Sequence, residues 1–475
     1  MIYTKLQSIV NQFNMDQYKG LAIYFLFYLY SSGESRSYLI QTAIENGNRK
    51  AGSENNLAFD VKDNDEEPQL LVDLNPKGAG ASLRALSPKT SKFCDDPDLL
   101  SCQIADISAN ILGKKSILLP GNIELKFKNK VPGNDNAYNY EGAGSSLIVI
   151  YNPESSAMSG TATLADGRTF VLEYIGEEGH LWKEMNIQKL NQLSYVSNGN
   201  RGEGRTPFQD FIELPPGNIN RREWNPLLNG TTDNTTMAFI SVKIHFTKEF
   251  ASITSNINDF VDKMLAITNQ GFLNSKVPIT VVMNCLEETG LEETGSANSM
   301  FDKFENSENL YQTADTALLL VKNLGDLCGI AYTYAIHGNA ISVVQKSCVE
   351  TFTYGHELAH NLGCQHNIEE TKNRNFPHGQ GSFIDNPYNP SQGYHTIMTY
   401  WKNSHPIKIN SYSNPDVIYP RTNTKTGDPE KSNNAAVLLQ NRFFIASLGD
   451  ESQQCFLKNC LNGKCKDSGL QIKNW

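Results

Sequence analysis

One stretch of the sequence decides what the rest of the chain must build: Gly355-His356-Glu357-Leu358-Ala359-His360-Asn361-Leu362-Gly363-Cys364-Gln365-His366. On a helix, His356 and His360 are one turn apart and share a face. Two neutral imidazoles there can bind one Zn²⁺ ion, and Glu357 beside them can take a proton from a zinc-activated water. Gly363 allows a sharp turn that returns His366 as a third ligand. The spacing therefore predicts a catalytic zinc site with one open position.

Two plainer interpretations compete with this one. A helix can carry two surface histidines without any metal. A structural zinc site would need a fourth protein ligand, and Cys364 is the nearest candidate, although its place between Gly363 and His366 should point it away. The extended motif fixes five positions, which favours the catalytic site.

Composition bounds the class of protein. A chain of 475 residues is too long for one ordinary core, so two or three domains are expected. The 41 basic and 51 acidic residues give a net charge of −10 and a pI near 5.5. No basic block stands out, so nucleic acid is not expected as a partner.

The N-terminus indicates export. The apolar run from Leu21 to Tyr30 follows Lys19 and precedes the small residues Ser31-Ser32-Gly33. Ten residues are too few to span a bilayer as a helix but suit the core of a signal peptide. We therefore predict a signal peptide at 1–33, a secreted protein, and no membrane span in the mature chain. The alternative is a buried strand.

Cysteines and glycosylation motifs agree with export. The nine cysteines include no Cys-x-x-Cys pair, so disulfides are favoured over a zinc ribbon. Their odd number leaves at least one thiol free or paired between chains. Asn229-Gly230-Thr231 and Asn234-Thr235-Thr236 are both acceptor motifs for N-glycosylation.

Local patterns divide the chain into further segments. Residues 34–195 are predicted as a β-rich module, poorly structured up to 90 and with a hairpin around Asp166-Gly167. Residues 196–236 read as a linker, whose basic pair Arg221-Arg222 is typical of a processing site. Residues 237–450 form the predicted catalytic domain, and 451–475 a short cysteine-containing tail.

The predicted catalytic domain alternates strands with helices, which indicates a mixed α/β fold around one sheet. We expect strands at 237–246, 278–283, 316–321, 328–332 and 340–344. We expect helices at 251–273, 296–304, 350–362 and 433–446.

The motifs resemble those of the metzincins, a family of metallopeptidases with a long zinc motif and a methionine turn. The turn would be Tyr394-His395-Thr396-Ile397-Met398-Thr399-Tyr400-Trp401, with Met398 beneath the metal. The segments 328–332 and 342–344 resemble the reprolysin-like branch (M12/M72-type). Asn367, directly after the third histidine, stands where reprolysins usually have an aspartate. Tyr400, two residues after the methionine, instead resembles the tyrosine found there in astacins and serralysins.

The resemblance implies a fold and a function. The fold would be an α+β catalytic domain with a mixed, mostly parallel sheet and an active-site helix, preceded by a propeptide-like module. The function would be that of a secreted zinc endopeptidase, made as a zymogen, with His356, His360 and His366 as ligands and Glu357 as general base.

Other residues enter through the same resemblance. Tyr400 would bind zinc or stabilise the oxyanion, or else be a core tyrosine. Gly329, Ile330 and Ala331 would pair with an extended protein or peptide substrate, unless they form an ordinary edge strand. One zinc ion is expected, while no residue pattern supports a possible Ca²⁺ site.

Two questions stay open at this point. Cys328 is expected to pair with Cys348, and Cys94 with Cys102, although either cysteine of the second pair could instead block zinc as a free thiolate. The chain could also be a catalytically silent metzincin-like binding or adhesion protein, but it keeps Glu357 and all three ligands. The sequence indicates neither cleavage specificity nor oligomeric state.

Overall fold

The computed structural model describes residues 67–74, 88–193, 210–213, 234–307, 310, 314–335, 340–369, 376–390, 392–449, 458–461 and 464–467. The predicted signal peptide and the first glycosylation motif lie outside these ranges, and Asn234 of the second is exposed. Of the helices described, none is both long and apolar enough to cross a membrane.

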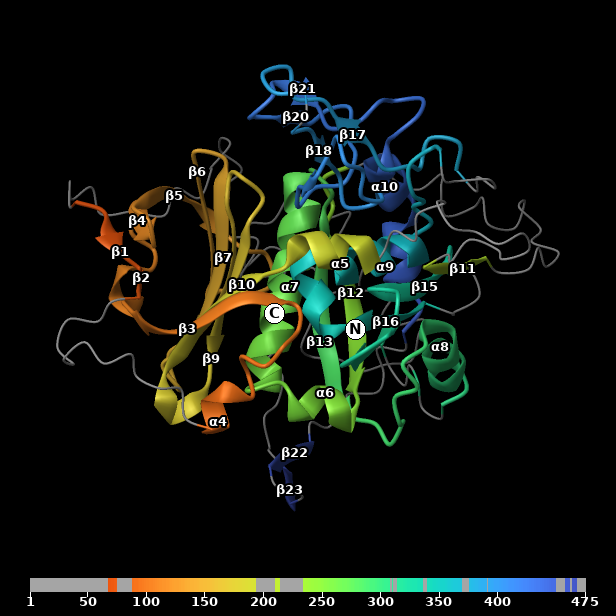
Figure 1. The fold of residues 1–475 in the computed structure, drawn as a ribbon. Coiled ribbons are helices and arrows are strands. Elements are labelled where there is room, and N and C mark those ends of the chain that lie inside the picture. Colours follow the sequence, from red (N-terminus) through yellow and green to blue (C-terminus); the bar gives the residue numbers. More distant parts are fainter. Residues whose placement is uncertain are drawn as a thin grey trace, which may run out of the picture. The chain divides into compact units, whose positions relative to one another are not determined.

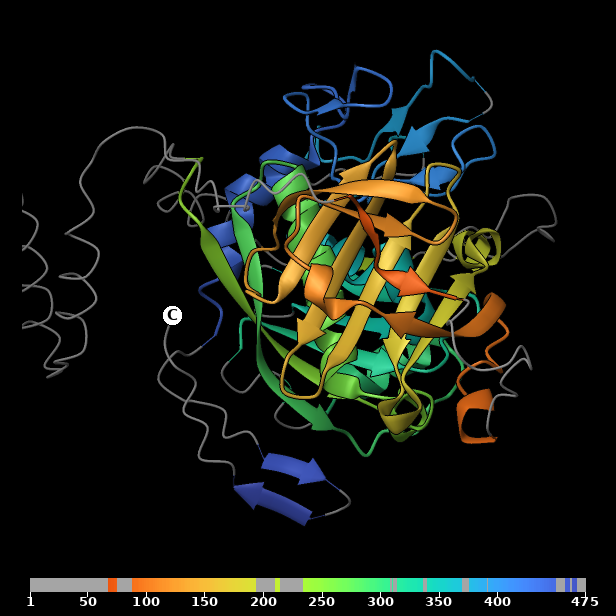
Figure 2. The same cartoon turned by 90° about the vertical axis from the view of Figure 1, so that its left-hand side faces the viewer.

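Ten strands between residues 69 and 185 form one sheet, in the order β1-β4-β5-β6-β7-β8-β9-β10-β3-β2 (Figures 1 and 2). Every neighbouring pair is antiparallel except β1 with β4. The strands are β1 Gln69–Leu70, β2 Val72–Asp73, β3 Leu99–Ile107, β4 Ser116–Leu119, β5 Ile123–Lys130, β6 Ala137–Gly142, β7 Ser145–Asn152, β8 Ala157–Thr163, β9 Thr169–Tyr174 and β10 His180–Met185. With the helix α5 (Ile187–Leu193), they form what we call the front module.

Local sequence explains much of this sheet. The hairpin expected around Asp166-Gly167 joins β8 to β9, with Gly167 at φ 90°, a conformation that favours glycine. The expectation that residues up to 90 lack structure is wrong at 69–73. There, Leu71 and Val72 are buried in the core of the sheet, and their burial stabilises strands in an otherwise polar segment.

A six-stranded sheet combines β11, which precedes residue 214, with five strands of the C-terminal region, residues 234–449, in the order β11-β15-β16-β14-β12-β13 (Figure 1). All pairs are parallel except β15 with β16, which confirms the mixed, mostly parallel sheet. The strands are β11 Phe211–Glu213, β12 Ala238–Phe246, β13 Ile279–Glu288, β14 Thr316–Val321, β15 Gly329–Thr333 and β16 Ile341–Gln345. The helices are α6 Lys248–Ser252, α7 Ile257–Asn274, α8 Ala297–Glu305, α9 Thr353–Asn361 and α10 Asn434–Ile445.

Helix α7 is buried between two layers (Figure 1). It begins at Asn256, whose side chain accepts a hydrogen bond from the Asp259 N–H. It packs against β13 of its own sheet and against β7 and β8 of the front module. One apolar cluster therefore joins Ile148 and Ile150 of the front module to Met264 of α7.

The polar side chains of this interface are paired. Glu350 accepts hydrogen bonds from Thr161 of the front module and, at 2.5 Å, from Lys263 of α7. Asn129 of β5 donates to Gln270 of α7 at 3.0 Å. Because these buried groups find partners across the interface, the front module docks without leaving them unsatisfied.

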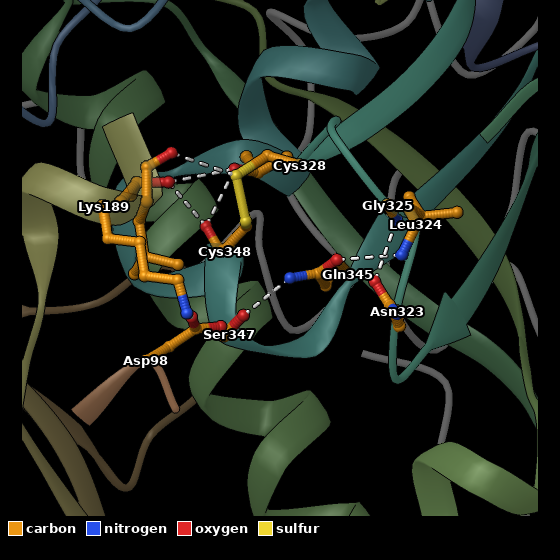
Figure 3. Close-up of a disulfide and its surroundings, with 12 residues drawn as sticks. Asp98, Lys189, Asn323, Leu324, Gly325, Cys328, Gln345, Ser347 and Cys348 are labelled. Atoms are coloured by element: carbon orange, nitrogen blue, oxygen red, sulfur yellow. Dashed lines mark hydrogen bonds and ion pairs between the residues drawn. A yellow bond between two sulfur atoms is a disulfide. The ribbon is translucent and has the colours of Figure 1, made fainter. Parts of the chain in front are cut away.

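Helix α5 rests on a disulfide (Figure 3). Cys328 pairs with Cys348, as expected, and this bridge packs in an apolar cluster with Leu190 of α5. The ion pair between Lys189 and Asp98, at 2.6 Å, lies beside it. The bridge joins the residue before β15 to the 3-10 turn before α9, so it links two elements of the predicted site.

The second expected disulfide, Cys94–Cys102, is also present. It overturns the hypothesis that one of these two cysteines blocks zinc as a free thiolate. Cys364 is a free, buried thiol.

The stability of the folded chain should fall in acid because of His180. Its buried Nε2 accepts the Met158 N–H at 3.0 Å, and burial lowers its pKa from 6.5 to about 4. Between these values the unfolded chain binds the proton and the folded chain does not, so stability is lost as pH falls from 6.5 toward 4. The loss should approach about 3 kcal/mol.

Urea unfolding at pH 7.5 and pH 4.5 measures this loss. His180→Gln keeps an acceptor but does not titrate, so its stability should fall less between the two pH values. Equal falls in both proteins would contradict the assignment.

Candidate metal centre and peptidase site

Helix α9 presents the metal-binding motif. His356, Glu357 and His360 are buried on it, as the one-turn spacing predicted. Gly363 ends the turn at φ 98°, where a Cβ would lie 2.7 Å from the Phe376 ring. Glycine therefore fits both the backbone and the space, and the chain returns to place His366 beside the other two histidines.

The three imidazoles turn their Nε2 atoms toward one another. The distances are 3.1 Å for His356–His366, 3.1 Å for His356–His360 and 3.0 Å for His360–His366. The Nδ1 atoms of His356 and His360 lie 2.9 Å from the carbonyl oxygens of Ile397 and Cys364, so they carry the ring protons.

This arrangement fits a bound cation. Each Nε2 with a protonated Nδ1 directs a lone pair at its neighbours, and such lone pairs repel unless a positive ion lies between them. Burial also lowers the pKa of His356 and His360, which favours the neutral form that binds metals. The donor set suits Zn²⁺.

Asp210 completes the cluster. Its carboxylate oxygens lie 3.0 Å from His366 Nε2, 3.4 Å from His356 Nε2 and 3.8 Å from His360 Nε2. Burial acts to raise the pKa of Asp210, but His366 and His356 hold it well below its usual range. Within the described ranges, these four residues are the one group of at least three side chains placed to hold a metal.

Asp210 was not among the predicted site residues, because 196–236 was predicted to be a linker. Residues 211–213 instead form β11, which pairs parallel with β15. The local signal was the apolar pair Phe211-Ile212 after the aspartate. The Phe211 ring packs against His360 and His366, with centroids 5.2 and 5.3 Å apart.

This pairing corrects the prediction for the segment 328–332. It forms β15, as expected, but in this structure β15 is not an edge strand because β11 covers it. Phe211 lies opposite Ala331, and the Ala331 N–H donates to the Asp210 carbonyl at 3.1 Å. Of the three residues expected to hold substrate, Ala331 is thus paired with the chain itself, and the pairing continues to Tyr332 and Thr333.

Tyr400 and Met398 both lie at this site. The Tyr400 hydroxyl donates to Asp210 Oδ1 at 2.9 Å, and its ring centroid is 3.9 Å from that of His366. Burial and the Asp210 charge raise the pKa of Tyr400 well above its usual range, so the phenol keeps its proton. Met398 is fully buried in the turn, whose Ile397 carbonyl orients His356.

Glu357 is held against the start of β15. Its Oε2 is buried without a hydrogen-bond partner among the described residues, and burial with the Asp210 charge raises its pKa well above the usual range. A Cβ on Gly329 would lie 2.4 Å from Glu357 Oε1. Only glycine at 329 lets the carboxyl approach this strand.

A small pocket adjoins Glu357 on the side of the methionine turn. Lys408, from β19 (Ile407–Lys408), lines it. Burial lowers the pKa of Lys408 to about 8, although the charges of Asp210 and Glu357 act to raise it. The lining residues are Asn191, Asp210, Thr353, His356, Glu357, Thr399, Tyr400, Trp401 and Lys408. Cys364 faces elsewhere, with its thiol 3.7 Å from the Asn434 carbonyl, so it is not a fourth ligand.

The sheet, the motif helix and the three-histidine cluster together define a class, the zinc metallopeptidases. Residues 236–413 match a family model described as Reprolysin_5, metallo-peptidase family M12. This part of the chain is similar to the zinc metallopeptidases of the reprolysin-like branch, as its motifs predicted.

Curated relatives carry one name. A peptidyl-Asp metalloendopeptidase of Stenotrophomonas maltophilia (strain R551-3) is 25% identical over 297 residues, covering 57% of this chain and 67% of the relative. One of the same name from Xanthomonas campestris pv. campestris is 27% identical over 193 residues, covering 37% of this chain and 44% of the relative. The chain thus spans under half of the Xanthomonas relative.

Solved structures are more distant. Metalloproteinase-II from Bacteroides fragilis is 12% identical with a TM-score of 0.36, covering 65% of this chain and 89% of that one. A chain from a chaperone–substrate complex is 17% identical with a TM-score of 0.37, and the match covers 62% of this chain and 44% of that one.

Gly329→Ala should disturb catalysis without removing the metal. The added methyl displaces the Glu357 carboxyl, and a misplacement of about 1 Å can cost ~100-fold in rate. Peptide hydrolysis should fall by that order while zinc content stays at the wild-type value. Gly290→Ala is the control, because a Cβ there meets no atom within 4 Å. Full activity in Gly329→Ala would show that Glu357 does not need this space.

Proposed function

We propose that the chain is a secreted zinc endopeptidase made as a zymogen, in which Asp210 and β11 keep the site closed. The observation that carries the proposal is the Asp210 carboxylate, 3.0 Å from His366 Nε2 and anchored on a strand that covers β15. Export is supported by the apolar run Leu21 to Tyr30 and by the two disulfides.

The proposed reaction is hydrolysis of a peptide bond. Zinc, when bound, polarises the scissile carbonyl and makes water a better nucleophile. Glu357 takes the proton of the attacking water and passes it to the departing amine nitrogen. The Tyr400 hydroxyl, once released from Asp210, donates to the developing oxyanion. Gly329, Ile330 and Ala331 pair with the extended substrate backbone.

Latency follows from where Asp210 and β11 lie. Asp210 occupies the side of the histidine cluster that the substrate carbonyl needs, and β11 pairs with Ala331, one of the residues that the substrate would use. Cleavage within 214–233, which includes Arg221-Arg222, would separate β11 from the C-terminal region. The polar contacts of the front module with α7 suit an interface that later opens to water.

The relatives' name suggests the substrate class. Since three curated relatives are named peptidyl-Asp metalloendopeptidases, we propose that this chain also cleaves at aspartate in protein or peptide substrates. The histidine cluster accounts for one zinc ion.

Asp210→Ala in the uncut chain tests the latency. Loss of a hydrogen bond to a charged group, about 1.5–3 kcal/mol, should raise the open fraction and the hydrolysis rate about 10- to 100-fold. The exposed Asp416→Ala is the matched control. An uncut Asp210→Ala chain as inactive as wild type, beside an active cut wild type, would exclude Asp210 as the latency residue.

Glu357→Ala tests the chemistry in the same assay. The wild-type chain, cut at a site-specific protease sequence inserted after Arg222, should hydrolyse protein and lose this activity to a zinc chelator. The variant should bind zinc and hydrolyse nothing. Equal activity in both would refute the mechanism, and a zinc-loaded, cut wild type without activity would favour a binding protein.

A further inference from the structure

The proposed mechanism leaves one charged group at the site without a task. Lys408 lines the pocket beside Glu357, on the strand β19, which pairs parallel with β18 (Tyr394–His395) directly before the methionine turn. Its neighbours there include Thr399 and Trp401 of the segment that carries Met398. The ammonium therefore lies between the active-site helix and the methionine turn.

This ammonium lacks a direct counter-ion. None of the residues that the structure describes forms a hydrogen bond or close ion pair with it, while Asp210 and Glu357 act on it at longer range. A partly buried cation without a close anion is unfavourable unless an anion arrives from elsewhere. Under the proposed function Asp210 leaves on activation, so the pocket then loses a negative charge near the Lys408 ammonium.

The pocket is closed in this structure. Asn191 of α5 and Asp210 both line it, leaving a cavity of about 10 Å³, near the space of one water molecule. Neither α5 nor Asp210 belongs to the C-terminal region. Removing the front module and Asp210 would open the pocket toward the substrate strand.

We propose that Lys408 binds the side-chain carboxylate of the substrate residue whose amide nitrogen is released. Glu357 must reach that nitrogen to protonate it, so the side chain entering beside Glu357 belongs to the residue after the scissile bond. A short carboxylate there would pair with the Lys408 ammonium. This inference rests on the proposed function and deepens it, because it assigns the acidic preference to one residue and to one side of the cleaved bond.

Paired peptides test the assignment. Two fluorogenic peptides differ only in Asp or Asn after the scissile bond, and the cut, zinc-loaded wild type should prefer Asp. Lys408→Met should lower the Asp:Asn ratio of kcat/KM roughly 100-fold, because the substrate charge is then left unpaired. Lys408→Arg should keep much of the preference. The exposed Lys431→Met, as control, should keep the wild-type ratio.

Several outcomes decide the matter. A wild type that cleaves without preferring Asp, or a Lys408→Met variant that keeps the wild-type ratio, would overturn the inference and leave the proposed function intact. A cut wild type that hydrolyses no peptide would refute the proposed function itself. Zinc content and melting temperature show whether each variant folds, and Lys408→Gln replaces the Met variant if that one does not. Cleavage sites mapped by mass spectrometry on an unfolded carrier protein should move away from Asp in the Met or Gln variant.

Discussion

The structure depends on one electrostatic constraint, the convergence of three imidazole Nε2 atoms at 3.0–3.1 Å from one another. Nothing in a peptide chain favours this arrangement without a cation. The helix spacing of His356 and His360, the left-handed turn at Gly363 and the carbonyl of Ile397 each fix one ring against that repulsion. A cation held by these residues would remove the repulsion, so metal binding and local folding would be coupled here.

The histidine cluster faces two ligands in turn under the proposed function. In the structure it faces the carboxylate of Asp210, which also accepts the Tyr400 hydroxyl. In the active enzyme it would face substrate, and Tyr400 would be free to turn its hydroxyl to the reaction. Closing the site with a carboxylate therefore uses the same donors that catalysis requires.

The sequence predicted the elements whose causes are local. Strand and helix periodicity placed β12, β14, β16 and α9, and the histidine spacing placed the ligands. The role of Asp210 could not be predicted, because it depends on a parallel strand pairing between residues more than a hundred positions apart, such as Phe211 with Ala331. Lys408 escaped notice for a similar reason. It belongs to no sequence motif, and its proposed role depends on the methionine turn and the helix α9 that line the same pocket.

Helix α7 has to satisfy two surroundings. Its apolar residues, such as Met264, lie in the shared core, while Asn269 and Gln270 are buried with partners in the front module. Lys263 is buried too and donates to Glu350, which also accepts from Thr161 of the front module. If the front module departs, these three side chains meet water, to which their chemistry is suited. The polar residues of this buried helix are thus already suited to the surface that the proposed maturation would expose.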